Sequence, residues 1–198
     1  MDRRDWDERY AGEELLWRAD PNRFLVSETA ALPPGRALDL ACGEGRNAVW
    51  LATVGWTVTG VDFSAVALDK ARRLAADRGV TVEWVNADLL HWDPDGAGWD
   101  LVVVLYLHLP REQRRAVHAR AASALAPGGT VLVVGHDLAN LSAGHGGPQD
   151  PAVLFTPADV ADDLAALDVV RAESVQRPVS TDAGEVMAID ALVRAVRR

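Results

Sequence analysis

From residue 36 onward, short apolar runs rich in valine and leucine alternate with segments of helical period. This alternation predicts repeated strand–helix units, which build a parallel sheet covered by helices. The run Leu-Val-Val-Val-Leu at 101–105 is typical of a strand buried on both faces, so we expect it at the centre of the sheet. A chain of 198 residues is long enough for one such domain.

The other elements follow from periodicity and from end signals. Strands are predicted at 37–41, 56–61, 80–85 and 130–134, and helices at 47–54, 65–79 and 111–126. Segments 169–180 and 185–196 are predicted as two strands joined by a tight turn, which makes a hairpin and not another crossover. Between these groups, 138–155 is a long glycine-rich connection, and we expect such a loop to be functional.

Composition excludes several classes of protein. Lys and Arg number 20 against 29 Asp and Glu, and the net charge of −9 opposes attraction to a phosphate backbone, so we expect no nucleic-acid partner. The single cysteine, Cys42, excludes an internal disulfide and a multi-cysteine zinc site, and no metal site is predicted. No stretch of about 18 apolar residues occurs and the first residues are charged, so we expect a cytoplasmic protein without a membrane partner.

A glycine-containing turn follows the first predicted strand, and an acidic residue lies in or at the end of each of the first three strands. The turn contains Gly43-Glu44-Gly45, and its small residues allow a sharp bend and a close ligand. Asp39 lies in the first strand, Asp62 closes the second about 20 positions later, and Asp88 ends the third. Because ligands of open α/β sheets bind outside the carboxyl ends of the strands, these acids are expected to line one crevice.

These residues carry a resemblance to the class I S-adenosylmethionine-dependent methyltransferases, with motifs at 38–45, 60–64 and 86–89. The resemblance extends from residue 36 to the terminal hairpin. It implies a three-layer α/β/α, Rossmann-like doubly wound sheet of seven strands, mostly parallel, with an antiparallel C-terminal hairpin. It also implies S-adenosylmethionine as cofactor and S-adenosylhomocysteine as product. One departure is Ala41, which replaces the first glycine of the usual G-x-G-x-G and is a mild change if its φ is negative.

The resemblance assigns cofactor contacts to residues at or after the ends of the first four strands. Asp62 would bind the ribose, Asp88 would reach the adenine amino group, and Asp39 would orient the methionine ammonium. The full set is Asp39, Ala41, Gly43, Gly45, Asp62, Phe63, Asp88, Leu89 and Leu105, with Phe63 and Leu89 flanking the adenine.

The N-terminal segments 6–10 and 21–25 resemble the small-molecule branch of this family, which includes tellurite-resistance and thiopurine-type enzymes. In that branch such a segment folds over the cofactor and excludes water. We therefore expect one domain, 1–198, with a helical lid at 1–35, cofactor-binding units at 36–137, and a substrate loop, helix and hairpin at 138–198. Trp6, Tyr10 and Trp17 are expected in the lid.

The candidates for handling the methyl acceptor are Tyr106, His108, His136 and Asp137, which follow the fourth and fifth strands. Methyl transfer needs chiefly positioning, and a general base is required only when the acceptor is protonated. Each candidate also has a plainer interpretation: His136 and Asp137 can form a hydrogen-bonded pair that ends a strand, and His108 can be solvated. His118, flanked by arginine, is expected on the surface.

The sequence therefore predicts methyl transfer to a small-molecule acceptor by a monomer or homodimer. Two other classes stay open, namely an NAD(P)-dependent oxidoreductase and a noncatalytic nucleotide-binding or scaffold protein. The glycine turn also satisfies the dinucleotide pattern G-x-G-x-x-G/A, but no second domain remains to hold a hydride acceptor. The accepting atom is left open, because loop residues select it and the fold does not.

Overall fold

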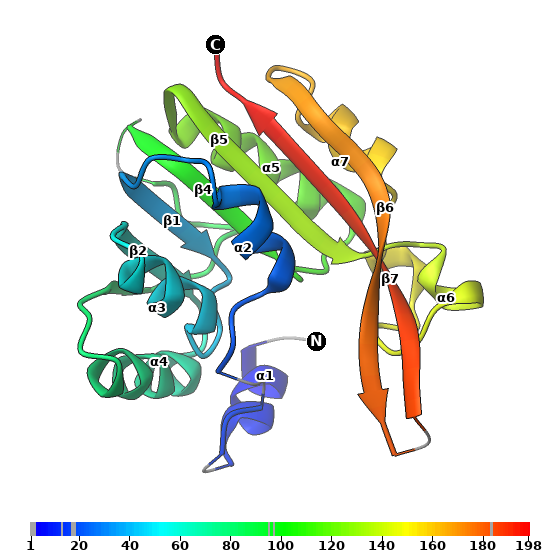
Figure 1. Ribbon diagram of the computed structural model, residues 1–198, viewed down its shortest axis with the longest axis horizontal. Coiled ribbons are helices and arrows are strands. Elements are labelled where there is room, and N and C mark those ends of the chain that lie inside the picture. Colours follow the sequence, from blue (N-terminus) through cyan, green and yellow to red (C-terminus); the bar gives the residue numbers. More distant parts are fainter. Residues whose placement is uncertain (1–2, 13, 17–18, 95, 97, 183) are drawn as a thin grey trace.

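A seven-stranded sheet organises the computed structural model, which describes residues 3–12, 14–16, 19–94, 96, 98–182 and 184–198 (Figure 1). The strand order is β3-β2-β1-β4-β5-β7-β6; the first five are parallel to one another, and β7 runs antiparallel to both of its neighbours. The strands are β1 (Arg36–Leu40), β2 (Thr57–Asp62), β3 (Glu83–Asn86), β4 (Trp99–Leu105), β5 (Leu125–His136), β6 (Asp168–Thr181) and β7 (Gly184–Val196). This arrangement confirms the predicted fold class.

Helices cover both faces of the sheet. The helices are α1 (Arg3–Tyr10), α2 (Arg23–Thr29), α3 (Arg46–Thr53), α4 (Ala65–Asp77), α5 (Arg111–Ala124), α6 (Asn140–Ala143) and α7 (Pro157–Asp163), with a 3-10 turn at Pro151–Val153. Alternate strand residues face opposite sides, so Val102 and Val104 pack with α5 and α7, whereas Leu101 and Val103 pack with α2 and α3. The molecule therefore has three layers.

Strand β4 occupies the middle of the sheet, as its apolar run predicted. The side chains of Leu101, Val102 and Val103 are fully buried, because helices cover the strand on both faces. A continuous apolar run is required where neither face meets water. The buried strand therefore fixes the position of its last residue, Leu105, and of the segment that begins at Tyr106.

Three local predictions were wrong in their boundaries. The α5 helix ends at Ala124 and β5 begins at once, so Pro127–Gly129 lies within a bulged strand start where the β4–β5 register shifts. Strand β3 is confined to 83–86 because residues 80–82 do not join the ladder. The 138–155 connection contains α6 and the 3-10 turn, where only a loop had been predicted.

Side chains cap the starts of two helices. The Ser64 side chain accepts from the Ala67 N–H and caps α4. Thr156 and Asp159 form a reciprocal capping box at the start of α7. Such caps satisfy amides that have no partner inside the helix.

The β6–β7 hairpin is longer than the sheet it joins. His136 at the end of β5 pairs with Asp190, so the part of the hairpin between Val175 and Asp190 extends past the carboxyl edge of β5. Figure 1 shows this part projecting on the same side as α1. The carboxyl edge of the sheet therefore lies between the N-terminal segment and the hairpin. Within the described ranges, no helix has the length and apolar character needed to cross a membrane.

Candidate active site

The turn after β1 adopts a left-handed backbone at three positions, with φ of 60° at Ala41, 54° at Gly43 and 80° at Gly45. The condition under which Ala41 would be a mild change therefore fails, because an alanine at positive φ is strained by about 1 kcal/mol or more. A Cβ on Gly45 would lie 2.7 Å from atoms of Ala71 and Trp84, so close packing excludes a side chain there. Gly43 lies against the Tyr10 hydroxyl.

The Asp39 carboxylate is buried, and one of its two oxygens lacks a hydrogen-bond partner among the described residues. Only 1% of the residue is exposed, and the oxygen in question is Oδ2. Burial, with a further contribution from the Asp62 carboxylate, raises the pKa of Asp39 to about 7. A donor brought to this oxygen would therefore find an unpaired acceptor.

Asp62 joins the turns that follow β1 and β2. Its Oδ2 accepts from the Gly43 N–H at 2.8 Å, and its Oδ1 accepts from the Ser64 N–H at 2.9 Å. Burial raises the pKa of this carboxyl above its ordinary value. Each carboxylate oxygen has a second lone pair, so Asp62 can still accept from a ligand.

A cavity of about 220 Å³ lies beside the ends of β2 and β3 and is lined by Arg3, Phe63, Asn86, Ala87 and Asp88. The cavity brings together Phe63 and Asp88, both of which were predicted from the sequence to contact the adenine. The Asp88 Oδ1 accepts from the Leu90 N–H at 2.9 Å, and the residue is exposed. The cavity is smaller than the roughly 300 Å³ of a whole-ligand pocket, so it suits part of a ligand.

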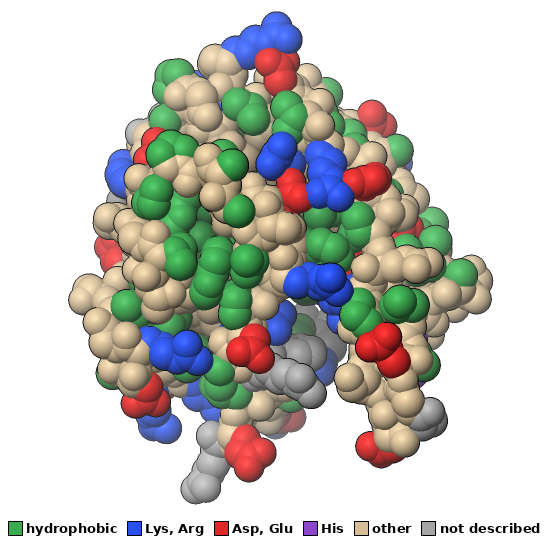
Figure 2. All heavy atoms as spheres, in the orientation of Figure 1, with side chains coloured by type: hydrophobic (Ala, Val, Ile, Leu, Met, Phe, Trp, Pro, Cys, Tyr) green, Lys and Arg blue, Asp and Glu red, His purple; other side chains and the backbone are tan. Residues whose placement is uncertain are grey.

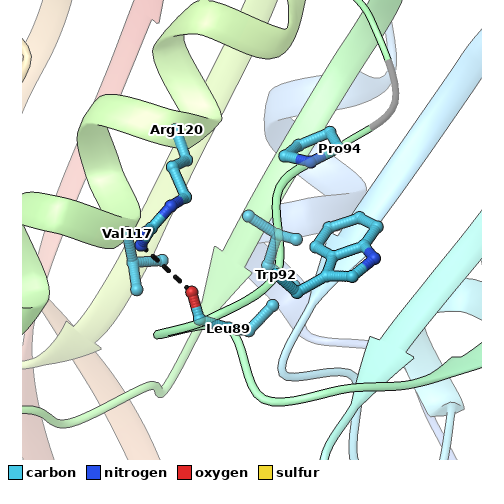
Figure 3. Close-up of a pocket in the computed structure, with 6 residues that line it drawn as sticks. Leu89, Trp92, Pro94, Val117 and Arg120 are labelled. Carbon is cyan, nitrogen blue, oxygen red and sulfur yellow. Dashed lines mark hydrogen bonds between the residues drawn. The ribbon is translucent and has the colours of Figure 1, made fainter.

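Leu89 lies elsewhere, which argues against its predicted place beside the adenine. It lines a second pocket, of about 10 Å³, together with Leu40, Trp92, Pro94, Val117 and Arg120 (Figure 3). The Arg120 Nη1 donates to the Leu89 carbonyl at 3.2 Å, and the Leu89 side chain packs on the core beneath α5. A space that holds about one water is part of the core packing.

The helix α1 lies over the ends of β1 and β2, next to α4 (Figure 1). Ser64 Oγ donates to Asp7 Oδ1 at 2.5 Å, which attaches α1 to the start of α4. Trp6 stacks on Tyr10 with ring centroids 5.5 Å apart, and Tyr10 is buried. Trp17, the third aromatic residue expected in the lid, lies outside the described residues.

A buried ion pair holds the following segment over the glycine turn. Lys70 on α4 contacts Glu44 at 3.0 Å and also donates to the Glu14 carbonyl at 2.5 Å. The Leu16 N–H donates to the same Glu44 carboxylate at 2.9 Å. Residues 14–16 are thus fixed against the turn by two charged side chains.

A second polar cluster follows β4 and β5. It contains Tyr106, His108 and His136, which the sequence predicted, together with Arg177 and Asp190, which it missed. Asp190 is fully buried; its Oδ2 accepts from the Tyr106 hydroxyl at 2.7 Å and from Arg177 Nε at 2.7 Å. The available signal was an acidic residue interrupting the apolar strand 186–195.

The two histidines of this cluster are stacked, with ring centroids 5.3 Å apart. The His136 backbone N–H donates to His108 Nε2 at 3.0 Å. Burial and the neighbouring His136 lower the pKa of His108 to about 4, and burial lowers the pKa of His136 as well. Both rings are therefore neutral near pH 7. Burial raises the pKa of Tyr106, which keeps its hydroxyl protonated.

Asp137 has other partners than His136. Its Oδ1 accepts from the Ala139 N–H at 2.9 Å and its Oδ2 accepts from the Ser174 hydroxyl at 2.5 Å. With only 2% of the residue exposed, the carboxylate joins β5, α6 and β6. This arrangement favours a structural role for Asp137 over the catalytic role predicted from sequence.

The prediction that His118 lies on the surface was wrong. Only 2% of the residue is exposed, and its Nδ1 lies 3.0 Å from Asp163 Oδ2. The same carboxylate accepts from Arg114 Nε at 2.8 Å. His118 therefore belongs to a buried cluster between α5 and α7.

The two halves of the candidate site share one edge of the sheet. The acids and the glycine turn follow β1, β2 and β3, whereas the histidine cluster follows β4 and β5 and is completed by the hairpin. Leu105, 7% exposed, ends β4 between these halves. Figure 2 shows the surface hollowed between the projecting hairpin and the N-terminal part of the chain, with basic side chains at its rim.

Comparison with known proteins finds a family model that is similar to most of the parallel part of the sheet. Residues 37–129 match the model described as "Methyltransferase domain". The chain is 36% identical over 106 residues to ribosomal RNA small subunit methyltransferase C of Alcanivorax borkumensis, covering 51% of this chain and 32% of the relative. It is 35% identical over 126 residues to demethylmenaquinone methyltransferase of Thermus thermophilus, covering 62% and 55%. The chain thus spans a third to about half of these relatives.

Solved structures show the same fold over nearly the whole chain. A structure concerned with converting a disulfide bond into a thioacetal group during echinomycin biosynthesis has a TM-score of 0.79 and 23% identity, covering 98% of this chain and 91% of its own. TehB of Haemophilus influenzae has a TM-score of 0.75 and 16% identity, covering 99% and 67%. The N-methyltransferase NodS of Bradyrhizobium japonicum, in complex with S-adenosylhomocysteine, has a TM-score of 0.71 and 22% identity, covering 98% and 97%.

Proposed function

We propose that the protein is an S-adenosylmethionine-dependent methyltransferase that acts on a small-molecule acceptor. The observation that carries the proposal is the buried Asp39 carboxylate, whose Oδ2 has no partner within the described residues although it borders the glycine turn. The methyltransferase match over 37–129 supports this function over a nicotinamide-dependent oxidoreductase. Turnover would separate the proposed function from that of a noncatalytic scaffold.

The residues at this edge fit the cofactor. S-adenosylmethionine supplies, when bound, a methyl group on a positively charged sulfur. An ammonium group suits the unpaired Asp39 oxygen, and a planar base suits the 220 Å³ cavity beside Phe63 and Asp88. The unpaired carboxylate oxygen of Asp39 and the cavity beside Phe63 and Asp88 are therefore complementary to the ammonium group and the base of this cofactor.

We assign the binding roles as follows. Asp62 accepts from the ribose hydroxyls with the lone pairs that its two backbone amides leave free. Gly43 and the strained Ala41 shape the turn, and the carbonyl of Leu105 accepts from the ammonium group. Gly45 and Leu89 serve packing in this assignment, because their neighbours are core side chains.

The N-terminal residues 1–35 act as a lid in this proposal, within one functional unit of 1–198. Trp6 and Tyr10 would cover the cofactor and exclude water, since Tyr10 already lies beside Gly43. The hollow between this segment and the hairpin would receive the acceptor (Figure 2). We propose a monomer or homodimer in the cytoplasm.

A small acceptor is supported by charge and by enclosure. The net charge of −9 disfavours a polyanionic nucleic acid, although one relative is named for ribosomal RNA. The partly buried cluster of Tyr106, His136 and Asp190 would meet an acceptor that enters between the lid and the hairpin. A small molecule can enter such a space more readily than a folded polymer.

Calorimetric titration with S-adenosylhomocysteine, with NAD and NADP in parallel, tests the cofactor. We expect micromolar binding of S-adenosylhomocysteine alone. Asp62→Ala should weaken it roughly ten- to a hundredfold, because two hydrogen bonds to a charged carboxylate are lost. Asp69→Ala, at an exposed position on α4, is the matched control and should bind as the wild type does.

Binding of NAD without S-adenosylhomocysteine would overturn the assignment, as would unchanged affinity in Asp62→Ala. Once binding is established, transfer of a labelled methyl group to a panel of phenols, thiols, amines and oxyanions tests turnover. Failure of every small acceptor, together with methylation of RNA, would contradict the proposed acceptor class.

A further inference from the structure

Asp190 is an acidic residue in the buried part of a strand. Its neighbours in β7, Ala188 and Ala191, are fully buried, and no part of Asp190 itself is exposed. A buried carboxylate is strongly destabilising unless it is paired and hydrogen-bonded. Here the Arg177 guanidinium supplies the counter-charge at 2.7 Å, and the Tyr106 hydroxyl donates to the same oxygen.

The other oxygen of Asp190 faces His136. The His136 Nδ1 lies 3.4 Å from Asp190 Oδ1, which is within ion-pair range but too poorly aligned for a hydrogen bond. This nitrogen is buried and has no other partner among the described residues. A buried N–H that faces a carboxylate interacts favourably with it, whereas the lone pair of an unprotonated nitrogen is repelled by the carboxylate. The proton of the neutral His136 ring therefore belongs on Nδ1.

The His136 ring is fixed on further sides. Its backbone N–H donates to His108 Nε2, and the two rings stack. A Cβ added to Gly147 would lie 2.7 Å from the His136 ring, so the loop after α6 packs tightly on it. The His136 side chain is 13% exposed, and its Nε2 forms no hydrogen bond within the described part of the chain.

We propose that Asp190, held by Tyr106 and Arg177, is a positioning residue that orients His136 as the general base for an acceptor whose reacting atom is a hydroxyl oxygen. This inference rests on the proposed methyltransferase function and adds the class of acceptor and the base. An acceptor that arrives as an anion would need no base, and the buried Asp190 would then have no role in the reaction.

The proton balance of this step is complete. The acceptor oxygen bonds to the methyl carbon as the carbon–sulfur bond breaks, and the electron pair of that bond stays on sulfur. The hydroxyl proton passes to Nε2 of His136. Asp190 stabilises the resulting imidazolium through Nδ1–H without taking the proton itself, and the imidazolium then releases a proton to water.

The groups that face His136 favour a neutral ring before the reaction. Burial lowers the pKa of His136; Asp190 on β7 opposes this effect, and Arg177 on β6 adds a smaller lowering. His108 and Tyr106, from the segment after β4, complete the surroundings and are themselves neutral near pH 7. A neutral imidazole with a free Nε2 is the form that a base requires.

Nitrogen-15 NMR of histidine-labelled protein bound to S-adenosylhomocysteine tests the orientation without any acceptor. We expect His136, identified by the signal lost in His136→Gln, to carry its proton on Nδ1 with Nε2 bare. In Asp190→Asn the side-chain amide can donate to Nδ1, so the proton should move to Nε2. Glu185→Gln, an exposed carboxylate on the same strand, is the control and should leave the tautomer unchanged.

The wild-type spectrum alone decides the proposal if Asp190→Asn fails to fold. A proton on Nε2 in the wild type would overturn it, as would an unchanged tautomer in folded Asp190→Asn. Failure to bind S-adenosylhomocysteine would instead contradict the proposed function, and the tautomer measured without ligand would still report on Asp190. The two failures are therefore distinguishable.

Discussion

Asp39 shows at the scale of one residue how a residue of the candidate site can reduce the stability of the fold. The carboxylate is buried beside Asp62, and both effects raise its pKa to about 7. At neutral pH part of the population must hold a charge in a desolvated position with one oxygen unpaired. A ligand ammonium would relieve this unfavourable state, so the energy lost in folding is recovered on binding.

We expect Asp39→Asn to stabilise the free protein above pH 7 and to weaken binding of S-adenosylhomocysteine. Because the folded-state pKa lies above the unfolded one, the wild type loses stability as pH rises from about 4 to about 7 and then levels off. A shift of about three pKa units corresponds to roughly 4 kcal/mol.

Urea unfolding at pH 5 and pH 8 measures this difference. The wild type should lose stability relative to Asp39→Asn between the two pH values, whereas the exposed Asp69→Asn should track the wild type. Equal pH dependence in Asp39→Asn and wild type would show that Asp39 does not titrate in this range.

At the scale of elements, the candidate site lies between two segments that extend past the sheet. One is the N-terminal segment, held by the contact of Ser64 with Asp7 and by the Lys70–Glu44 pair. The other is the end of the β6–β7 hairpin, which carries Arg177. The short helix α1 has few residues in the core, so its stability depends on these attachments.

Hydrogen–deuterium exchange should show that S-adenosylhomocysteine protects α1. In the free protein we expect fast exchange in residues 3–10, because a helix of eight residues is marginal by itself. Ligand bound beneath it should slow this exchange at least tenfold and leave α7 unchanged. Equal exchange with and without ligand would argue against a lid at 1–35.

At the scale of the whole molecule, a buried charge cluster connects two helices on one face of the sheet. Asp163 on α7 contacts Arg114 at 2.8 Å and His118 at 3.0 Å, both on α5. Burial would raise the pKa of Asp163, but the His118 and Arg114 hydrogen bonds outweigh it and lower the pKa. These helices cover β4, β5 and β7, so the cluster supports the strands that carry His136 and Asp190.

Asp163→Ala should destabilise the protein by about 3 kcal/mol or more, because it leaves Arg114 buried without a counter-charge. Urea unfolding at pH 7 measures the loss. Asp162→Ala, exposed on the same helix, should change stability by less than about 0.5 kcal/mol. Similar losses in the two variants would contradict the role of the cluster.

Local patterns were sufficient for the sheet and for bringing Phe63 and Asp88 together after β2 and β3. The apolar run at 101–105 predicted the central strand because burial on both faces permits no polar residue. Phe63 and Asp88 follow the ends of β2 and β3, and they meet at one cavity because parallel strands end at the same edge of the sheet. The strand boundaries near 80 and 127 were missed, because ladder pairing and not propensity ends those strands.

The polar cluster after β4 and β5 was decided by tertiary structure. The antiparallel register of β5 with β7 sets Asp190 opposite His136, and the pairing of β6 with β7 brings Arg177 to the same carboxylate. Because His136 lies about 40 to 50 residues before Arg177 and Asp190 in the chain, no local sequence pattern predicts their contact. The sequence therefore determined the fold and the shared position of Phe63 and Asp88, whereas the charge partners of His136 came only from long-range strand register, which depends on the packing of the whole sheet.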